Sequence, residues 1–109
     1  IVKECIKDKY DVVITTGGTG LSNRDITPDV IKNIIDKELP GFMEHIRTTI
    51  SVSNPYNLLS RGVAGVTKKT LFYTLPGNHE IVIDYLTEIK KSLLFAIYMV
   101  HGIDRYFRA

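Results

Sequence analysis

Thr15-Thr-Gly-Gly-Thr-Gly-Leu-Ser-Asn-Arg-Asp-Ile-Thr-Pro-Asp29 is the stretch that decides the fold of this chain. It overlaps the end of Asp11-Val-Val-Ile-Thr-Thr16, whose consecutive apolar residues predict a strand buried on both faces, as in a parallel sheet. It ends in Thr27-Pro-Asp29, which predicts a helix start, because Thr27 can cap and proline suits the first helical position. A strand, a glycine-rich turn and a capped helix therefore follow one another directly.

Alternating helical and strand patterns flank this stretch on both sides. The chain opens with a short helical pattern before its first strand, which suggests that earlier strands are missing. This alternation predicts one α/β domain over residues 1–109 with a mostly parallel sheet, N-terminally incomplete. We expect further helices from Thr27 to Pro40-Gly41, from about Gly41 to Val52, over Val82–Ile89 and, largely buried, over Leu93–Val100, with strands at Val63–Val66 and Leu71–Leu75.

The composition excludes several classes of protein. A chain that is 44% hydrophobic and 24% charged has the balance of a soluble globular domain rather than of a disordered one. A formal net charge of +2 gives no support for a nucleic-acid-coating protein, yet it allows a local basic pocket. The single cysteine, Cys5, excludes an internal disulfide framework. No signal peptide is visible, so we expect a reducing, cytoplasmic setting.

Gly17-Gly-Thr-Gly20 is the first candidate site, at the point where the first strand ends. Glycines let a backbone approach a ligand closely and present several N–H donors to an anion. In open α/β sheets, ligands bind beyond the carboxyl ends of the strands. The alternative is a plain tight turn, since the motif is neither a P-loop nor a dinucleotide fingerprint.

Arg24-Asp25 follows in the same predicted loop. The Asp25 carboxylate could hold Mg²⁺ between phosphate oxygens or polarise an attacking nucleophile. Alternatively, it could bond nearby N–H groups as a structural loop residue. Leu75-Pro-Gly-Asn78 is a second strand–turn–helix junction that could face the glycine loop across a crevice. Ser60-Arg61, before another predicted strand, is a similar but weaker candidate.

The stretch from Thr15 to Asp29 resembles the signature of the molybdenum-cofactor biosynthesis family that includes MogA, MoaB and the G domain of gephyrin. Leu39-Pro-Gly-Phe42 is similar to the family's second-helix entrance. Leu59-Ser-Arg61 with Ala64-Gly-Val66 resembles its later substrate-loop region, and Leu75-Pro-Gly-Asn78 its last active-site turn. The resemblance extends from about Val2 to Val100.

The resemblance implies a three-layer α/β/α fold that binds molybdopterin. It implies Mg²⁺-dependent transfer of AMP from ATP to molybdopterin, with release of pyrophosphate. Asp25 would be the catalytic aspartate near the metal, and Thr27 would close the loop and cap the helix. The remaining roles would be phosphate binding by Gly17, Gly18, Thr19 and Gly20, pterin binding by Arg61 and Ser60, and nucleotide contact by Pro76, Gly77 and Asn78.

Two departures from the family pattern concern the activity. The family domain begins with a strand–helix–strand portion that carries a Ser-Asp motif and a second catalytic acid, and this chain contains neither. His79 stands where the family's last turn usually continues with proline. The alternative function is therefore a MoaB-like molybdopterin-binding protein without efficient adenylyl transfer, while a receptor-scaffolding role like that of gephyrin-like relatives is disfavoured.

The apolar run Leu93–Val100 predicts an oligomer. A helix that is apolar all round must be covered on more than one side, and the sheet can cover only one. MogA-like relatives are trimers and some MoaB-like relatives are hexamers, so we expect a homotrimer, with a hexamer as the alternative. A monomer in which a missing N-terminal part or the Tyr106-Phe107 tail covers the helix is the competing expectation.

Overall fold

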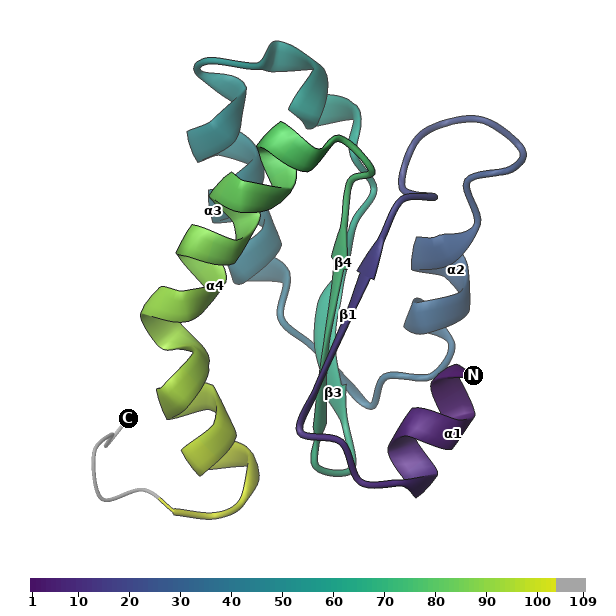
Figure 1. Cartoon of the computed structure of the whole chain (residues 1–109), viewed down its shortest axis with the longest axis vertical. Coiled ribbons are helices and arrows are strands. Elements are labelled where there is room, and N and C mark those ends of the chain that lie inside the picture. The colour runs from purple at the N-terminus through teal and green to yellow at the C-terminus, as the bar shows by residue number, and fades with distance from the viewer. Residues whose placement is uncertain (104–109) are drawn as a thin grey trace.

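The computed structural model describes residues 1–103. Its centre is a sheet of four strands in the order β1 (Val12–Thr16), β4 (Thr70–Leu75), β3 (Ala64–Thr67) and β2 (Lys37–Glu38). One face carries α1 (Val2–Lys7) and α2 (Thr27–Lys32), and the other carries α3 (Pro40–Ser51) and α4 (His79–Val100) (Figure 1). A 3-10 helix, η1 (Pro55–Leu59), lies at one end of the molecule. These three layers confirm the expected α/β/α fold class.

The described sheet is mixed, which corrects the expectation of a mostly parallel one. β1 and β4 are parallel, with Val12 opposite Leu71. β3 is antiparallel to β4, and β2 is antiparallel to β3. Only Lys68 and Lys69 separate β3 from β4. A connection this short can only reverse the chain, whereas parallel strands need a long crossover.

The fully buried strand is β4 rather than β1. All six residues of β4 are buried, but none of the five residues of β1 is, and Ile14 is 40% exposed. β4 lies between two strands with helices on both faces, whereas β1 forms an edge of the described sheet. Side chains alternate along β4. Leu71, Tyr73 and Leu75 join the core under α3 and α4, and Phe72 joins the smaller core under α1 and α2.

The segment between the glycine loop and α3 differs from the expected long helix. α2 ends at Lys32, and the chain then forms β2, a strand that the apolar spacing did not predict. Thr27 is the first residue of α2 and its side chain makes no capping hydrogen bond, so its expected capping role is wrong. Pro28 stands in the first turn as predicted, and Pro40 begins α3 instead of ending a helix.

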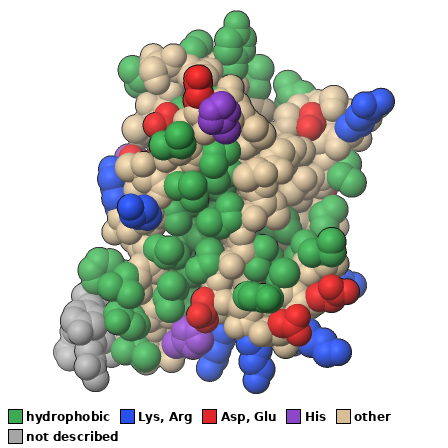
Figure 2. All heavy atoms as spheres, viewed as in Figure 1, with side chains coloured by type: hydrophobic (Ala, Val, Ile, Leu, Met, Phe, Trp, Pro, Cys, Tyr) green, Lys and Arg blue, Asp and Glu red, His purple; other side chains and the backbone are tan. Residues whose placement is uncertain are grey.

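One helix of 22 residues, α4, replaces the two helices expected at the end of the chain. Asn78 caps it, since its Oδ1 accepts a hydrogen bond from the Glu80 N–H at 3.0 Å. Its second half is not largely buried, because Leu94 is 58%, Phe95 42% and Met99 49% exposed. Figure 2 shows hydrophobic side chains gathered on the surface over this part of α4. Within residues 1–103, no helix has the length and apolar character needed to cross a membrane.

Candidate functional site

Three segments meet at the end of the sheet where β1 and β4 finish (Figure 1). They are the glycine loop over residues 17–26, η1 with the following Ser60-Arg61, and the turn over residues 76–78. The Gly17 N–H donates to the Leu75 carbonyl at 2.8 Å and extends the β1–β4 ladder by one bond. A Cβ placed on Gly77 would lie 3.5 Å from the Gly17 Cα, so the two turns touch. The two turns, which were expected to face each other across a crevice, are therefore in direct contact at the base of the site.

The glycine loop closes on the start of α2. Gly17 and Gly18 have φ angles of +89° and +73°, a region that residues with a side chain rarely adopt. The Thr27 N–H donates to the Gly18 carbonyl at 3.2 Å. A Cβ on Gly18 would collide with the Thr27 hydroxyl. Thr27 therefore closes the loop as expected, and Gly18 is required by backbone conformation and by this contact before any ligand is considered.

Asp25 is held within the loop as an ionised, half-exposed carboxylate. Its Oδ2 accepts hydrogen bonds from the Ser22 hydroxyl at 2.8 Å and the Ser22 N–H at 3.0 Å. The Ser22 hydroxyl, followed by the Ser22 N–H, lowers the pKa of Asp25 below its ordinary value. A Cβ on Gly20 would lie 2.8 Å from the same oxygen, so glycine leaves room for the carboxylate.

Arg61 ties the glycine loop to α2. Its backbone N–H donates to the Thr19 carbonyl at 2.8 Å, and its Nε donates to the Gly20 carbonyl at 2.8 Å. Its Nη2 donates to the Asp25 carbonyl. Nη1 and Nη2 also bind the two carboxylate oxygens of Asp29, each at 3.2 Å, and this contact lowers the pKa of Asp29. The described role of Arg61 is to order the loop; its contact with a pterin stays a prediction.

Arg47 is a contributor that the sequence did not reveal. From α3, its Nη1 donates to the carbonyls of Ser60 at 3.1 Å and Gly62 at 3.2 Å. These are the residues on either side of Arg61. Arg47 therefore fixes the backbone that carries Arg61, and Arg61 in turn orders the glycine loop.

A cavity of about 290 Å³ opens between the three segments. Five of the predicted site residues line it: Thr19, Gly20, Ser60, Pro76 and Asn78. The other predicted residues lie beside or behind this lining, within the contacts described above: Gly17, Gly18, Asp25, Thr27, Arg61 and Gly77. The structure thus brings all the predicted site residues to one end of the sheet.

η1 supplies part of the cavity wall that sequence reasoning missed. Asn57 lines the cavity and is only 3% exposed, and its Oδ1 accepts a hydrogen bond from the Tyr85 hydroxyl at 3.1 Å. Its amide nitrogen has no partner within the described part of the chain. The neighbouring Tyr56 is 80% exposed at the same cavity. The Asn54-Pro55 pair was a signal for η1, because proline also suits the first position of a new helical turn.

The side chains of the site could bind Mg²⁺ only if phosphate oxygens of a substrate completed its coordination. Among residues 1–103, no three His, Cys, Asp or Glu side chains come together as a metal site. Mg²⁺ commonly takes one or two carboxylates and completes its shell with water and substrate phosphates. Asp25 is ionised and half-exposed, and the carboxylate of Asp29 is engaged by Arg61. Asp25 therefore fits as a single protein ligand for a phosphate-bound Mg²⁺.

Comparisons with known proteins identify the family of this chain. Residues 1–96 match the family described as "Probable molybdopterin binding domain". The molybdopterin adenylyltransferase of Helicobacter pylori strain J99 is 36% identical over 102 residues, which are 94% of this chain and 58% of that protein. Molybdenum cofactor biosynthesis protein B of Staphylococcus aureus strain Mu50 is 40% identical over 79 residues, 71% of this chain and 47% of that protein.

A solved structure shows the same fold. The molybdopterin biosynthesis Mog protein of Mycobacterium ulcerans superposes with a TM-score of 0.89 at 34% identity, covering 93% of this chain and 66% of that one. The chain spans a little over half the length of the Helicobacter relative. From the family match and these likenesses, we conclude that the chain belongs to the molybdopterin-binding family of molybdenum-cofactor biosynthesis proteins.

Proposed function

We propose that the protein acts in molybdenum-cofactor biosynthesis by transferring AMP from ATP to molybdopterin, with release of pyrophosphate. The observation that carries this proposal is the loop end of the sheet. There the glycine loop, Ser60-Arg61 and the turn over residues 76–78 surround one cavity, with the ionised Asp25 next to Gly20. The name of the Helicobacter pylori relative, molybdopterin adenylyltransferase, supports the same reaction.

The proposed chemistry depends on positioning and charge. An oxygen of the molybdopterin phosphate attacks the α-phosphorus of ATP, a new P–O bond forms, and the bond to pyrophosphate breaks. Phosphoryl transfer needs preorganised donors more than covalent help from the protein. We assign the N–H group of Thr19 to a phosphate oxygen, because this residue lines the cavity, while the Gly20 backbone bonds to the Asp25 carboxylate. When bound, Mg²⁺ would neutralise phosphate charge beside Asp25.

A second candidate function is molybdopterin binding without efficient transfer. The observation that favours it is that only one aspartate carboxylate at the site, that of Asp25, is not paired with an arginine. Asp25 offers one carboxylate, while that of Asp29 is occupied by Arg61. A binder needs the cavity and the loop, but a transferase of this family pattern needs a second acid.

Titration calorimetry combined with a pyrophosphate-release assay tests both candidates. The protein is titrated with molybdopterin, and ATP with Mg²⁺ is then added while pyrophosphate is measured. Stoichiometric binding followed by ATP-dependent release of pyrophosphate supports the transferase. Binding without release supports the binder, and the absence of molybdopterin binding rejects both.

We also propose that the protein is a homotrimer, with a hexamer as the alternative. The exposed apolar strip on the second half of α4, formed by Leu94, Phe95 and Met99, is the surface that a neighbouring copy would cover. Tyr106 and Phe107, which a monomer could use for this purpose, lie outside the described residues. Sedimentation equilibrium at micromolar concentration should show trimer mass, and a single species at monomer mass would reject this proposal alone.

A further inference from the structure

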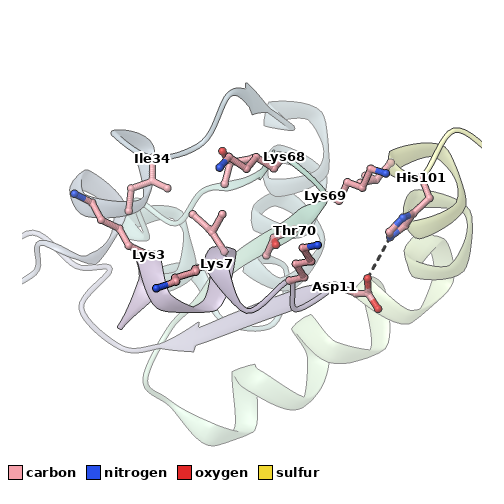
Figure 3. A pocket seen from close by; sticks show the side chains of 12 residues that line it. Lys3, Lys7, Asp11, Ile34, Lys68, Lys69, Thr70 and His101 are labelled. Atoms are coloured by element: carbon pink, nitrogen blue, oxygen red, sulfur yellow. Dashed lines mark hydrogen bonds and ion pairs between the residues drawn. The ribbon is translucent and has the colours of Figure 1, made fainter.

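A second cavity, larger than the one at the glycine loop, lies at the other end of the sheet. It encloses about 1040 Å³. Its walls come from α1, the turn before β1, the turn between β3 and β4, and the end of α4 (Figure 3). None of the residues assigned to the loop-end site lines it. Any ligand of this cavity is therefore separate from the proposed reaction.

Positive charge dominates the lining of this cavity. Five of its residues are lysines: Lys3, Lys7, Lys9, Lys68 and Lys69. Within residues 1–103, none of these five ammonium groups forms an ion pair. The one carboxylate in the lining, that of Asp11, lies 3.2 Å from the His101 Nε2. Five lysines and one aspartate give the lining a formal charge of +4, above the net charge of +2 of the entire chain.

The backbone gives a second, independent indication that this charge matters. Lys9 and Lys68 have φ angles of 62° and 52°, and they are the only described residues besides glycine with a positive φ. Both line this cavity. Left-handed backbone is costly for residues with a Cβ, and a two-residue hairpin turn such as Lys68-Lys69 ordinarily takes asparagine and glycine. The chain thus places lysine where the backbone alone favours another residue.

The arrangement of the lysines indicates an extended anionic ligand. Figure 3 shows Lys3 and Lys7 on α1 at one side of the cavity and Lys69 near His101 at the other, so the ammonium groups do not converge on one point. A single phosphate would need converging donors. Lysine is a mobile point charge, which suits a chain of separate carboxylates.

The uncharged residues of the lining favour a peptide over a nucleic acid as the ligand. Ile6, Ile34 and Val100 add apolar surface between the charges. The described lining has no Phe, Tyr or Trp, and its one ring, that of His101, is paired with Asp11, so the cavity offers little surface on which successive bases could stack. An apolar side chain of a peptide, in contrast, would cover this surface.

We propose that this lysine groove docks an acidic peptide segment of a partner protein. Carboxylates of the segment pair with Lys3, Lys7, Lys9, Lys68 and Lys69, and an apolar side chain rests against Ile6, Ile34 and Val100. Such exposed ion pairs bind weakly and are screened by salt. The interaction is therefore reversible and loses strength as ionic strength rises.

Fluorescence anisotropy with the full chain tests the proposal. The probe is a labelled peptide of alternating glutamate and leucine, and the matched control probe has glutamine in place of glutamate. We expect the glutamate peptide to bind at least about tenfold more tightly at low salt, and this preference to shrink in high salt. Lys3→Gln/Lys7→Gln should weaken binding about tenfold. Lys90→Gln/Lys91→Gln, which removes the same charge from α4, should leave it unchanged.

A variant that keeps the fold intact separates binding from stability. Lys68→Asn removes one charge and suits the positive φ, so it should weaken peptide binding several-fold without lowering the midpoint of urea unfolding. Equal affinity for the two peptides, no peptide binding, or unchanged binding by the lysine variants would overturn the proposal. So would tighter, lysine-dependent binding of single-stranded poly-U RNA than of the glutamate peptide.

Discussion

The two ends of the sheet use their cationic side chains in opposite ways. At the loop end, Arg47 and Arg61 point at backbone carbonyls and at the Asp29 carboxylate, so their hydrogen bonds order the protein itself. At the other end, lysines line a groove without ion-pair partners among the described residues; in Figure 2 lysine and arginine side chains gather along this lower edge. Arginine forms a rigid planar fork and lysine a mobile point charge. The contrast separates a preorganised site from an adaptable one.

The largest expected effect sharpens the chemistry of the loop end. Asp25→Asn should lower adenylyl transfer by roughly two orders of magnitude or more, the scale for loss of one preorganised electrostatic group. Molybdopterin affinity should stay within a few-fold, because Asp25 acts on the reacting phosphates. Asp84→Asn, an exposed substitution on α4, is the matched control, and equal turnover by both variants would reject the catalytic role.

Exchange of arginine for lysine tests the contrast itself. Arg61→Lys should weaken binding of a phosphorylated ligand about tenfold, since lysine cannot bind the Gly20 carbonyl and both Asp29 oxygens together. Lys69→Arg in the groove should change peptide binding by less than about twofold, because a point charge there is replaced by another cation. Calorimetric titration measures the first affinity and anisotropy the second. If Arg61→Lys left the affinity for the phosphorylated ligand unchanged, the proposed difference between the two ends of the sheet would be wrong.

Gly18→Ala probes how tightly the loop is built. The φ of +73° and the collision with the Thr27 hydroxyl should together lower the free energy of unfolding by about 2 kcal/mol. Thr27→Ser keeps the hydroxyl, so it should not relieve the collision. Thr27→Ala should recover part of the loss in the double variant, and urea denaturation measures each step. Additive losses in the double variant would show that only the φ angle matters.

The buried pair beneath the cavity should contribute less. Tyr85→Phe removes the hydrogen bond to Asn57 and should lower the free energy of unfolding by about 1 kcal/mol. Asn57→Leu in the Tyr85→Phe background removes the stranded amide as well, so the double variant should be no less stable than Tyr85→Phe. Thermal and urea unfolding measure these differences. If Asn57→Leu makes the double variant clearly less stable, the amide has another partner.

The smallest expected effect is a dependence on pH at the loop end. Hydrogen bonds from Ser22 and Arg61 lower the folded-state pKa values of Asp25 and Asp29. Their stabilisation is therefore fully present above the ordinary aspartate value of 3.8 and is lost as pH falls through the folded-state values. Unfolding midpoints measured from pH 6 to pH 2 should fall less steeply for Asp29→Asn than for the unaltered protein. Identical slopes would show that the Arg61–Asp29 contact is too exposed to matter.

The sequence could predict those parts of the site that depend on local chain order. The positions of the glycine loop and of the Pro76–Asn78 turn could be predicted because each directly follows a recognisable strand, and that of Asp25 because it lies in the same loop. Arg47 could not be assigned a role, because an arginine on a helix ordinarily indicates a solvated face. The pairing of Arg61 with Asp29 joins residues 32 positions apart, beyond any periodicity. Long-range contacts of this kind require the folded chain.

In the fold, too, local features could be predicted from the sequence and long-range pairings could not. The helical and strand segments were largely predictable from apolar spacing, while the direction of the strands was not. β2 has only two residues, both exposed, so it leaves no hydrophobic pattern. Two apolar stripes predict two helices at the end of the chain, yet α4 is continuous, and no proline or glycine stands between His79 and Val100. The exposed half of α4 showed that an apolar run need not be buried within one chain.

The parallel pairing of β1 with β4 also has a consequence for the order of folding. β3 and β4 are joined by a two-residue turn, so this hairpin can form within microseconds. Val12 pairs with Leu71 only when a loop of 58 intervening residues closes, which costs more conformational entropy. We expect the docking of β1 to follow the main folding barrier. Val13→Ala should then speed unfolding and hardly change the folding rate, whereas Leu71→Ala should slow folding, as stopped-flow kinetics would show. The glycine loop is attached to the strand that arrives last, so a chain arrested before that step would hold a formed hairpin and no site.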